Sequence, residues 1–445
     1  MRPAAELVPL LKLAGPVVLA EIGWMSMGLV DTMMVGPFGP AAIAATGLGS
    51  GVFTAIAIFG MGLMLGLDAL VSQAYGAGDR GECARWLRHG AALAIAAAPF
   101  VMAVTWLAYL SLDRWGLHPD IQALAAGYVR VIAVGAWPLL LYAAFRRYLQ
   151  GMHVVRPIMV ALISANIVNA ASNWVLIYGH LGMPALGVEG SAWATTLARL
   201  YMAAFLYVAI RREHRRRPPP AVSTRLEPAR LRRLVALGFP AAMQTTLEVG
   251  VFAAATALAG KLDPVSSASH QIALNLASLA FMVPLGLASS GAVRVGYAVG
   301  ARDPVRAAHA GWMALAASAV VMTAIGAVFY ALPTVLLRGF TTDARVIEIG
   351  IGLLAIAAAF QLFDGTQAVA TGVLRGIGDT RTPMLTNVVG HWLLGLPVGY
   401  ALCFTFAWGV AGLWIGLSVG LVFVSAILLF VWWKRSHAMR STVES

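Results

Sequence analysis

The sequence predicts an all-α integral membrane protein, with twelve transmembrane helices in two six-helix lobes that are related by a pseudo-twofold axis along the membrane normal. Three observations predict this fold: an apolar composition, twelve long apolar runs and an internal repeat. Of the 445 residues, 60% are apolar and 11% are charged, whereas soluble domains have about 25% charged residues. Such a chain lacks the polar surface of a soluble globule. Its composition also excludes a disordered chain, a collagen and a disulfide scaffold.

Twelve apolar runs are each long enough to cross a bilayer, which requires about 20 residues. Because lipid offers the backbone no hydrogen-bond partners, only helices and closed barrels span it. The runs show no two-residue alternation, so they predict helices. They lie at approximately residues 9–35, 42–73, 88–110, 121–145, 157–179, 188–210, 234–260, 268–298, 308–332, 346–372, 383–406 and 409–433.

The basic residues are distributed as an orientation signal. Segments on one side of the predicted membrane hold 25 of the 31 Lys and Arg residues, including Arg146 and Arg147 after the fourth run, and the opposite side holds four. Arg130 and Arg199 lie inside runs. The positive-inside rule places the basic side and both termini in the cytoplasm. The formal charge of +12 therefore reflects topology and does not indicate a nucleic-acid partner.

One arginine-rich linker divides the chain. Residues 211–233 contain RREHRRRPPP and nine arginines, a composition typical of a solvated linker that also fixes topology. It separates a predicted N-lobe at 1–210 from a predicted C-lobe at 234–445.

An internal repeat relates these two halves. At an offset of 224 residues, and later of 222, landmarks of the first half align with those of the second: Pro16 with Pro240, Gly36 with Gly260, Pro40 with Pro264, Asp79 with Asp303, and Gly187 with Gly409. Because each half has six spans, the two repeats share one orientation. Parallel repeats of this kind are typical of transporters.

Five carboxylates lie more than three residues from the ends of the predicted spans, namely Glu21, Asp31, Asp68, Glu248 and Asp364. A charged residue at the centre of a membrane helix costs about 2.5–3.5 kcal/mol, so these groups must be protonated, paired or exposed to a water-filled cavity. Apart from arginines counted on the basic side, the spans contain only Arg130 and Arg199, which leaves some carboxylates to bind a proton or another cation. Such a group has the chemistry of an exchange site.

Neutral polar residues accompany these carboxylates. Asn166, Asn169 and Asn173 form one stripe of a helix, which indicates either hydrogen bonds between helices or a polar wall facing Asp31. Glu21 and Arg199 lie at similar estimated depth, so we expect them to form a structural ion pair.

The second half has a comparable set. Gln244 precedes Glu248 by one helical turn, and Gln361 precedes Asp364 by three residues. His391 shares a helix face with Asn387, although a lone membrane histidine is more often a packing group than a proton carrier.

The ordered motifs resemble those of the multidrug and toxic compound extrusion (MATE) transporters, closest to their NorM-like branch, over essentially the whole chain. The motifs are LKLAGPVVLA…GLVDTMMVG, LDALVSQAYGAGD, GVEGSAWATT, SHQIALNLASLAFMVPLGLASSGAVRVGYAVGA, FQLFDGTQAVATGVLRGIGDTRTPM and GLPVGY.

This resemblance implies an antiporter that exports organic, often cationic, compounds in exchange for Na⁺ or H⁺ by alternating access. Asp31 looks like the N-lobe carboxylate of the family, and Glu248 and Asp364 look like the C-lobe cation site of the NorM branch, where Na⁺ would bind. Asn173 stands where some relatives carry Asp. The expected polar residues of the substrate cavity are Asn169, Asn173, Thr195, Gln244, Gln361 and His391.

The expected protein is thus a non-enzymatic transporter in a bacterial cytoplasmic (inner) membrane. It needs no cofactor besides the coupling ion, and its partners are small organic cations and the bilayer; it is expected to be a monomer. One alternative is a lipid-linked oligosaccharide flippase with the same two-lobed plan. A weaker alternative is an intramembrane hydrolase, because Gly416-Leu417-Ser418-Val419-Gly420 matches a nucleophile pattern. No GxxxxGK[ST] loop for ATP occurs.

Overall fold

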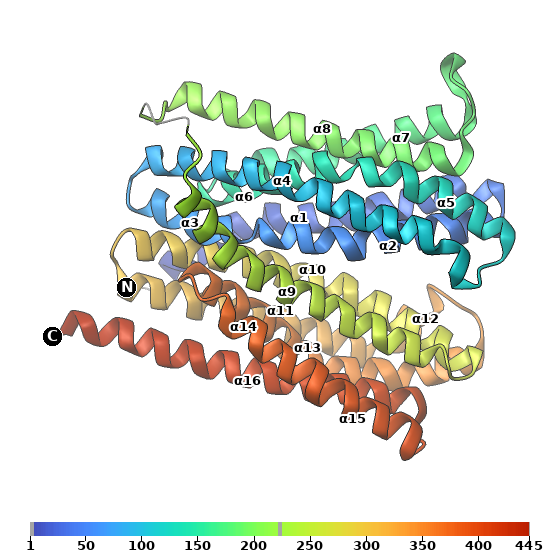
Figure 1. Ribbon diagram of the computed structural model, residues 1–445. Coiled ribbons are helices and arrows are strands. Elements are labelled where there is room, and N and C mark those ends of the chain that lie inside the picture. Colours follow the sequence, from blue (N-terminus) through green and yellow to red (C-terminus); the bar gives the residue numbers. More distant parts are fainter. Residues whose placement is uncertain (1–3, 221–224, 445) are drawn as a thin grey trace. The chain divides into compact units, whose positions relative to one another are not determined.

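A computed structural model describes residues 4–220 and 225–444 (Figure 1). Arg2 and the middle of the predicted linker lie outside these described residues. The α-helices of the described residues are α1 (Ala4–Val35), α2 (Pro40–Leu63), α3 (Gly66–Gly76), α4 (Arg80–Ser111), α5 (Pro119–Val134), α6 (Ala136–Gly151), α7 (Arg156–Tyr178), α8 (Gly187–Arg216), α9 (Pro228–Ala259), α10 (Pro264–Gly300), α11 (Pro304–Ala331), α12 (Pro333–Arg338), α13 (Ala344–Gly376), α14 (Arg381–Asn387), α15 (Leu396–Tyr400) and α16 (Gly409–Glu444).

The helices confirm the predicted all-α membrane fold. Eleven helical segments of the described chain are long and apolar enough to cross a membrane, and the bent pair α5 and α6 supplies a twelfth span. The span at 381–405 is itself irregular, because π-helical stretches at Val388–Gly395 and Ala401–Thr405 flank α15. Single π-helical turns occur often at functional sites.

The bend between α5 and α6 has a local cause. Pro138 lies in the first turn of α6, and proline removes a backbone donor and clashes with the preceding turn of a helix. The chain breaks at Gly135 and turns by 46°. The sequence of α13 contains no proline, and α13 runs unbroken from residue 344 to 376.

The described chain divides into two compact units. The N unit comprises Leu19–Ala242, and the C unit comprises Met1–Val18 together with Met243–Ser445. The C unit therefore contains the beginning of α1, and the N unit contains the beginning of α9. The two boundaries, at Val18 and Ala242, are 224 residues apart, which is the offset of the sequence repeat. In the C unit, Leu10 and Ala14 of α1 belong to a buried cluster with Val373 and Trp432.

Close helix contacts hold the start of α9 in the N unit. At Gly238 an added Cβ would overlap the carbonyl of Leu63, where α2 ends, and at Gly66 one would meet the backbone of Leu234. Glycines at both positions allow the two backbones to touch at the break between α2 and α3.

The internal repeat reappears in the turns. Asp79 and Asp303, which are 224 residues apart, both cap a helix, because their side chains accept hydrogen bonds from the backbone N–H groups of Glu82 and Arg306 at 2.7 and 2.9 Å. The residue before each cap has a left-handed conformation, with φ of 76° at Gly78 and 57° at Arg302. The two halves thus share turn geometry as well as sequence landmarks.

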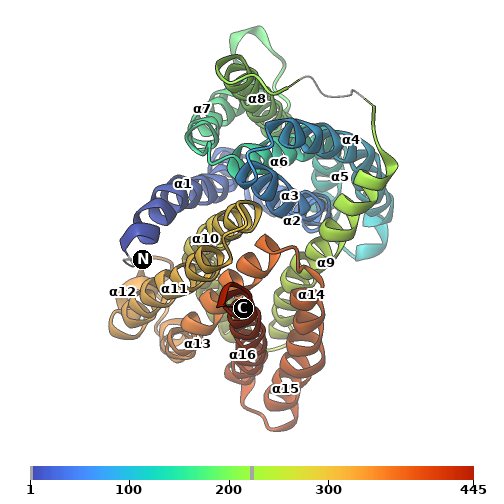
Figure 2. The same cartoon turned by 90° about the vertical axis from the view of Figure 1, so that its left-hand side faces the viewer.

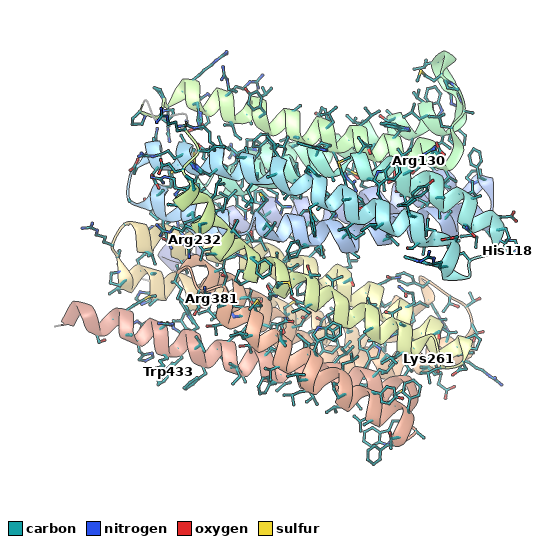
Figure 3. The ribbon with its side chains drawn as sticks, viewed as in Figure 1. His118, Arg130, Arg232, Lys261, Arg381 and Trp433 are labelled. Atoms are coloured by element: carbon teal, nitrogen blue, oxygen red, sulfur yellow. The ribbon has the colours of Figure 1, made fainter. Side chains whose placement is uncertain are left out.

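The labelled polar side chains of Figure 3 lie toward both ends of each unit. In the N unit, Arg232 lies at the end opposite His118 and Arg130, and in the C unit Arg381 lies at the end opposite Lys261 (Figure 3).

Glycines allow the last spans of the C unit to pack backbone against backbone. In Figure 2 the helices are seen nearly end-on, with α16 beside α15. A Cβ added at Gly416 of α16 would overlap the backbone of Gly399 in α15. A Cβ added at Gly352 of α13 would meet nothing within 4 Å.

We therefore expect Gly416→Ala to lower the free energy of unfolding by about 1–3 kcal/mol through overpacking. The matched control Gly352→Ala should be neutral or stabilising, since alanine favours a helix over glycine by about 1 kcal/mol. Thermal unfolding of the two purified variants in detergent measures the difference. Equal melting temperatures would contradict the close contact.

Candidate functional site: two buried acidic clusters

Asp31 is the centre of a polar cluster in the N unit. Its Oδ1 accepts hydrogen bonds from the side-chain amides of Asn169 at 3.0 Å and Asn173 at 2.7 Å, and its Oδ2 accepts one from the Thr195 hydroxyl at 2.6 Å. All four side chains are buried. The structure thus brings together four residues that the sequence analysis selected.

Helix geometry explains this convergence. Asn169 and Asn173 are four residues apart on α7, so they lie on one face of that helix. A Cβ added at Gly190 of α8 would touch the backbone of Leu176 in α7, so glycine permits close packing of these two helices. The asparagine stripe combines both predicted roles. Asn169 and Asn173 face Asp31, whereas Asn166 makes a hydrogen bond between helices by donating to the Gly23 carbonyl at 3.0 Å.

Arg199 lies one helical turn beyond Thr195 on α8 and is also buried. Its guanidinium carbon is 4.4 Å from the centroid of the Phe53 ring, a cation–π distance. Its charge interacts with that of Asp31. Its Nε and Nη1 atoms have no hydrogen-bond partner in the described parts of the chain.

The predicted pair between Glu21 and Arg199 is wrong. Glu21 instead forms a buried ion pair with Arg146, and the neighbouring Asp68 carboxylate lies 3.4 Å from Arg147. The apolar run that ends at residue 145 predicted a loop position for both arginines. However, α6 continues to Gly151, so its last two turns carry these cations into contact with the carboxylates.

Glu248 is the centre of a second cluster, in the C unit. Gln244 donates to its Oε2 at 2.6 Å, and Gln367 donates to its Oε1 at 2.7 Å. The carbonyl of the Gln367 amide lies 3.0 Å from Nε2 of His391, so the histidine donates from Nε2. Gln367 therefore bridges Glu248 and His391.

Asp364 and Gln361 lie on α13, one helical turn apart. Asp364 is buried and interacts electrostatically with Glu248, which places the two predicted carboxylates of this half in one region. Gln361 is fully buried, yet neither of its amide atoms has a hydrogen-bond partner among the described residues. A buried amide without partners is costly, and a ligand in this region would satisfy it.

Gln367 is the functional candidate that the sequence analysis did not select. Its signal was present, because Gln361, Asp364 and Gln367 follow one another at intervals of three residues in FQLFDGTQ and therefore share one side of a helix. The bridge to His391 was not predictable, because it depends on how α13 packs against the π-helical stretch that carries this histidine.

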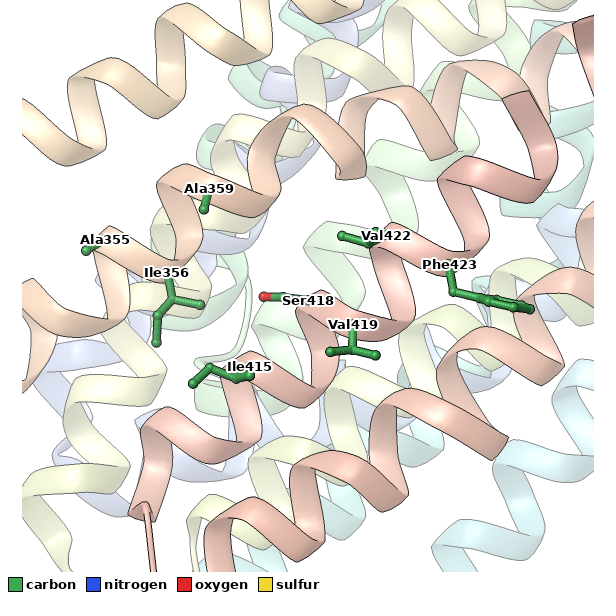
Figure 4. Close-up of a pocket in the computed structure, with 8 residues that line it drawn as sticks. All are labelled: Ala355, Ile356, Ala359, Ile415, Ser418, Val419, Val422 and Phe423. Atoms are coloured by element: carbon green, nitrogen blue, oxygen red, sulfur yellow. The ribbon is translucent and has the colours of Figure 1, made fainter. Parts of the chain in front are cut away.

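A separate groove on the C unit is apolar. Ser418 lines it together with aliphatic and aromatic side chains of α13 and α16, namely Ala355, Ile356, Ala359, Ile415, Val419, Val422 and Phe423 (Figure 4). The Ser418 hydroxyl donates to the Trp414 carbonyl at 2.7 Å within its own helix. No acid or base lines the groove with it, so the nucleophile pattern is a packing feature.

The described residues contain no group of three or more His, Cys, Asp or Glu side chains arranged to hold a metal ion. The two clusters combine carboxylates with amide and hydroxyl groups. Such oxygen ligands suit hard cations better than the soft metals that thiolate ligands select.

Comparisons with known proteins agree with this architecture. The MatE family profile matches residues 16–175 and 240–401. A Mesorhizobium japonicum protein named probable multidrug resistance protein NorM is 36% identical over 441 residues, which cover 97% of this chain and 94% of its own. A Brucella suis protein of the same name is 33% identical over 449 residues, which cover 98% and 95%.

Solved structures show the same fold. A eukaryotic MATE transporter superposes with a TM-score of 0.89 at 20% identity, covering 99% of both chains. A MOP superfamily transporter from Pyrococcus furiosus superposes with a TM-score of 0.86 at 20% identity, covering 98% of this chain and 97% of the other. The fold is therefore that of a two-lobed membrane transporter. The chain belongs to the MATE family, whose members are transporters and not enzymes, and this confirms the resemblance of its motifs.

The Glu21–Arg146 pair yields a stability prediction. Removing one partner of a buried ion pair leaves an uncompensated charge and costs about 3–5 kcal/mol, so Arg146→Gln should strongly lower the melting temperature, and Glu21→Gln in the same chain should restore part of it. Arg130→Gln is the control, because the Arg130–Glu189 pair at 3.2 Å is exposed and such pairs contribute about 0–1 kcal/mol. Similar losses for Arg146→Gln and Arg130→Gln would contradict the burial of the first pair.

The Gln367 bridge yields a second prediction. Gln367→Leu leaves Glu248 and His391 without a shared partner, so it should lower the free energy of unfolding by about 1–3 kcal/mol. Gln361→Leu on the same helix removes an amide that has no hydrogen-bond partner among the described residues. This substitution should leave the free energy of unfolding unchanged or raise it. Thermal unfolding of both variants compares them, and a larger loss for Gln361→Leu would be the opposite of this expectation.

Proposed function

We propose that this MATE protein is a multidrug efflux antiporter that exports organic cations in exchange for Na⁺ or H⁺. The relatives from Mesorhizobium japonicum and Brucella suis are named multidrug resistance proteins, which supports the efflux role. The observation that carries the proposal is the pair of Glu248 and Asp364. These two carboxylates interact inside an apolar unit, and the hydrogen-bond partners of Glu248 are neutral amides.

The physical basis of exchange is charge compensation. Two carboxylates that share a buried region repel each other when both are ionised, and desolvation penalises each charge further. A bound proton, Na⁺ ion or organic cation relieves both costs. Because the same negative charge attracts all three, a coupling ion that enters from outside displaces the cationic cargo, and alternating access makes the exchange vectorial.

Asp31 supplies a third acidic position in this proposal. The polar groups expected to line the path of the cargo are the neutral partners and neighbours of the three carboxylates: Asn169, Asn173, Thr195, Gln244, Gln361 and His391. Amide and hydroxyl groups orient a cation without fixing its shape, which suits a broad range of cargo.

The orientation and the assembly state complete the proposal. The protein acts as a monomer in the cytoplasmic membrane. Both termini lie inside the cell, an orientation that the distribution of arginines favours. The flippase alternative requires a cavity that attracts pyrophosphate and thus exposes cations. The acidic Glu248 and Asp364 favour cationic cargo instead.

The test is efflux of a fluorescent organic cation from proteoliposomes under separately imposed Na⁺ and pH gradients. We expect one gradient to drive export by the wild-type protein, and Glu248→Gln or Asp364→Asn to lower the gradient-driven rate by about tenfold or more, a loss equivalent to at least 1.4 kcal/mol. Asp31→Asn tests the third position.

Glu348→Gln is the matched control, because Glu348 is an exposed carboxylate on α13, the helix that carries Asp364. It should transport like the wild type. The antiporter proposal fails if neither gradient drives export, and the role of the Glu248–Asp364 pair fails if neutralising both leaves the driven rate unchanged.

A further inference from the structure

The two units neutralise their buried carboxylates differently. In the N unit, Glu21 pairs with Arg146, Asp68 lies beside Arg147, and Asp31 interacts with Arg199. Each carboxylate thus has an arginine of its own.

The described residues of the C unit show no comparable cation beside its central pair. The groups that act on Glu248 and Asp364 are neutral glutamines and the two carboxylates themselves. Arg375 lies on the same helix as Asp364 but eleven residues further on, about 16 Å along the axis at 1.5 Å per residue.

Arg199 differs from Arg146 and Arg147 because it makes no close ion pair with its carboxylate in the described parts of the chain. It is only 6% exposed, its Nε and Nη1 atoms lack partners within the described chain, and it lies against the face of Phe53 at 4.4 Å. Neutral donors from Asn169, Asn173 and Thr195 occupy the Asp31 oxygens instead. The guanidinium therefore retains unused donors one helical turn from the carboxylate cluster.

The backbone leaves space for this guanidinium. A Cβ added at Gly135 would lie 2.8 Å from Arg199 Nη1 and 3.0 Å from the Thr196 hydroxyl, so any larger residue at Gly135 would displace the arginine. Gly135 is also the break between α5 and α6. The bend of this span and the missing side chain at Gly135 together leave room for the Arg199 guanidinium.

We propose that Arg199 is a tethered competitor for Asp31, which balances the charge of this carboxylate and weakens the binding of a free Na⁺ ion at the Asp31 cluster. A second cation near Asp31 would be attracted by the carboxylate but repelled by the guanidinium at short range in a medium of low dielectric constant. The inference deepens the proposed function, because it assigns the coupling ion to Glu248 and Asp364 and not to Asp31.

The test measures ²²Na⁺ binding at equilibrium to the purified full-length protein in detergent, without any gradient. In a background with Glu248→Gln and Asp364→Asn, only the N unit retains its buried carboxylates. We expect weak Na⁺ binding in this background. Adding Arg199→Gln should raise the Na⁺ affinity about tenfold or more, which is within the usual range of couplings between linked sites. Adding Asp31→Asn as well should remove that gain. Arg130→Gln in the same background is the control for removing an exposed arginine and should have no effect.

Folding of the arginine variant supplies a second readout. If Arg199→Gln alone gives little folded protein, recovery of the folded yield in Arg199→Gln combined with Asp31→Asn supports the charge balance, and equal losses in both variants overturn it. The proposal is also overturned if folded Arg199→Gln binds Na⁺ no better than its background, or if the background already binds Na⁺ through Asp31 as tightly as the wild-type protein does. Because binding needs no transport, a failure of gradient-driven export counts against the proposed function and leaves this result intact.

Discussion

A charge inside an apolar helix bundle must be compensated, and much of the interior of this protein follows from that constraint. Burial of an unpaired ion costs several kcal/mol, which is comparable to the whole stability of many proteins. The Glu21–Arg146 contact meets the constraint with a permanent partner. Glu248 meets it only in part, because the neutral amides of Gln244 and Gln367 solvate its carboxylate without cancelling its charge. Partial compensation is what a reversible cation site requires.

The two halves show how a repeat diverges. Their turns have stayed alike, as the caps at Asp79 and Asp303 and the left-handed residues before them show. The interiors of the two halves, in contrast, differ. Pro138 bends one span of the N unit at Gly135, while α13 has no proline and stays continuous. That bend provides room for Arg199, so a difference in backbone shape accompanies a difference in charge.

The fold was largely predictable from the sequence, because composition and long apolar runs respond to the membrane itself. The carboxylates were predictable for the same reason, since each stands out in an apolar helix. Their partners were less so. Arg146 was predicted to lie in a loop because a charge normally ends a membrane span, but it lies within α6, where the buried Glu21 compensates its charge. Gln367 shares the helical face of Asp364, but its contact with His391 depends on packing between helices far apart in sequence, which local periodicity does not encode.

The exchange of helix beginnings between the units has a consequence for biosynthesis. Residues 228–242 of α9 belong to the N unit, and the first residues of α1 belong to the C unit. Translation proceeds from the N-terminus, so the six spans made first stay incomplete until the seventh emerges from the ribosome. Throughout that interval Leu10 and Ala14 of α1 lack Val373 and Trp432, with which they are buried in the finished C unit. Maturation is consequently a joint event of both halves, and neither half expressed by itself contains all the residues of a finished unit.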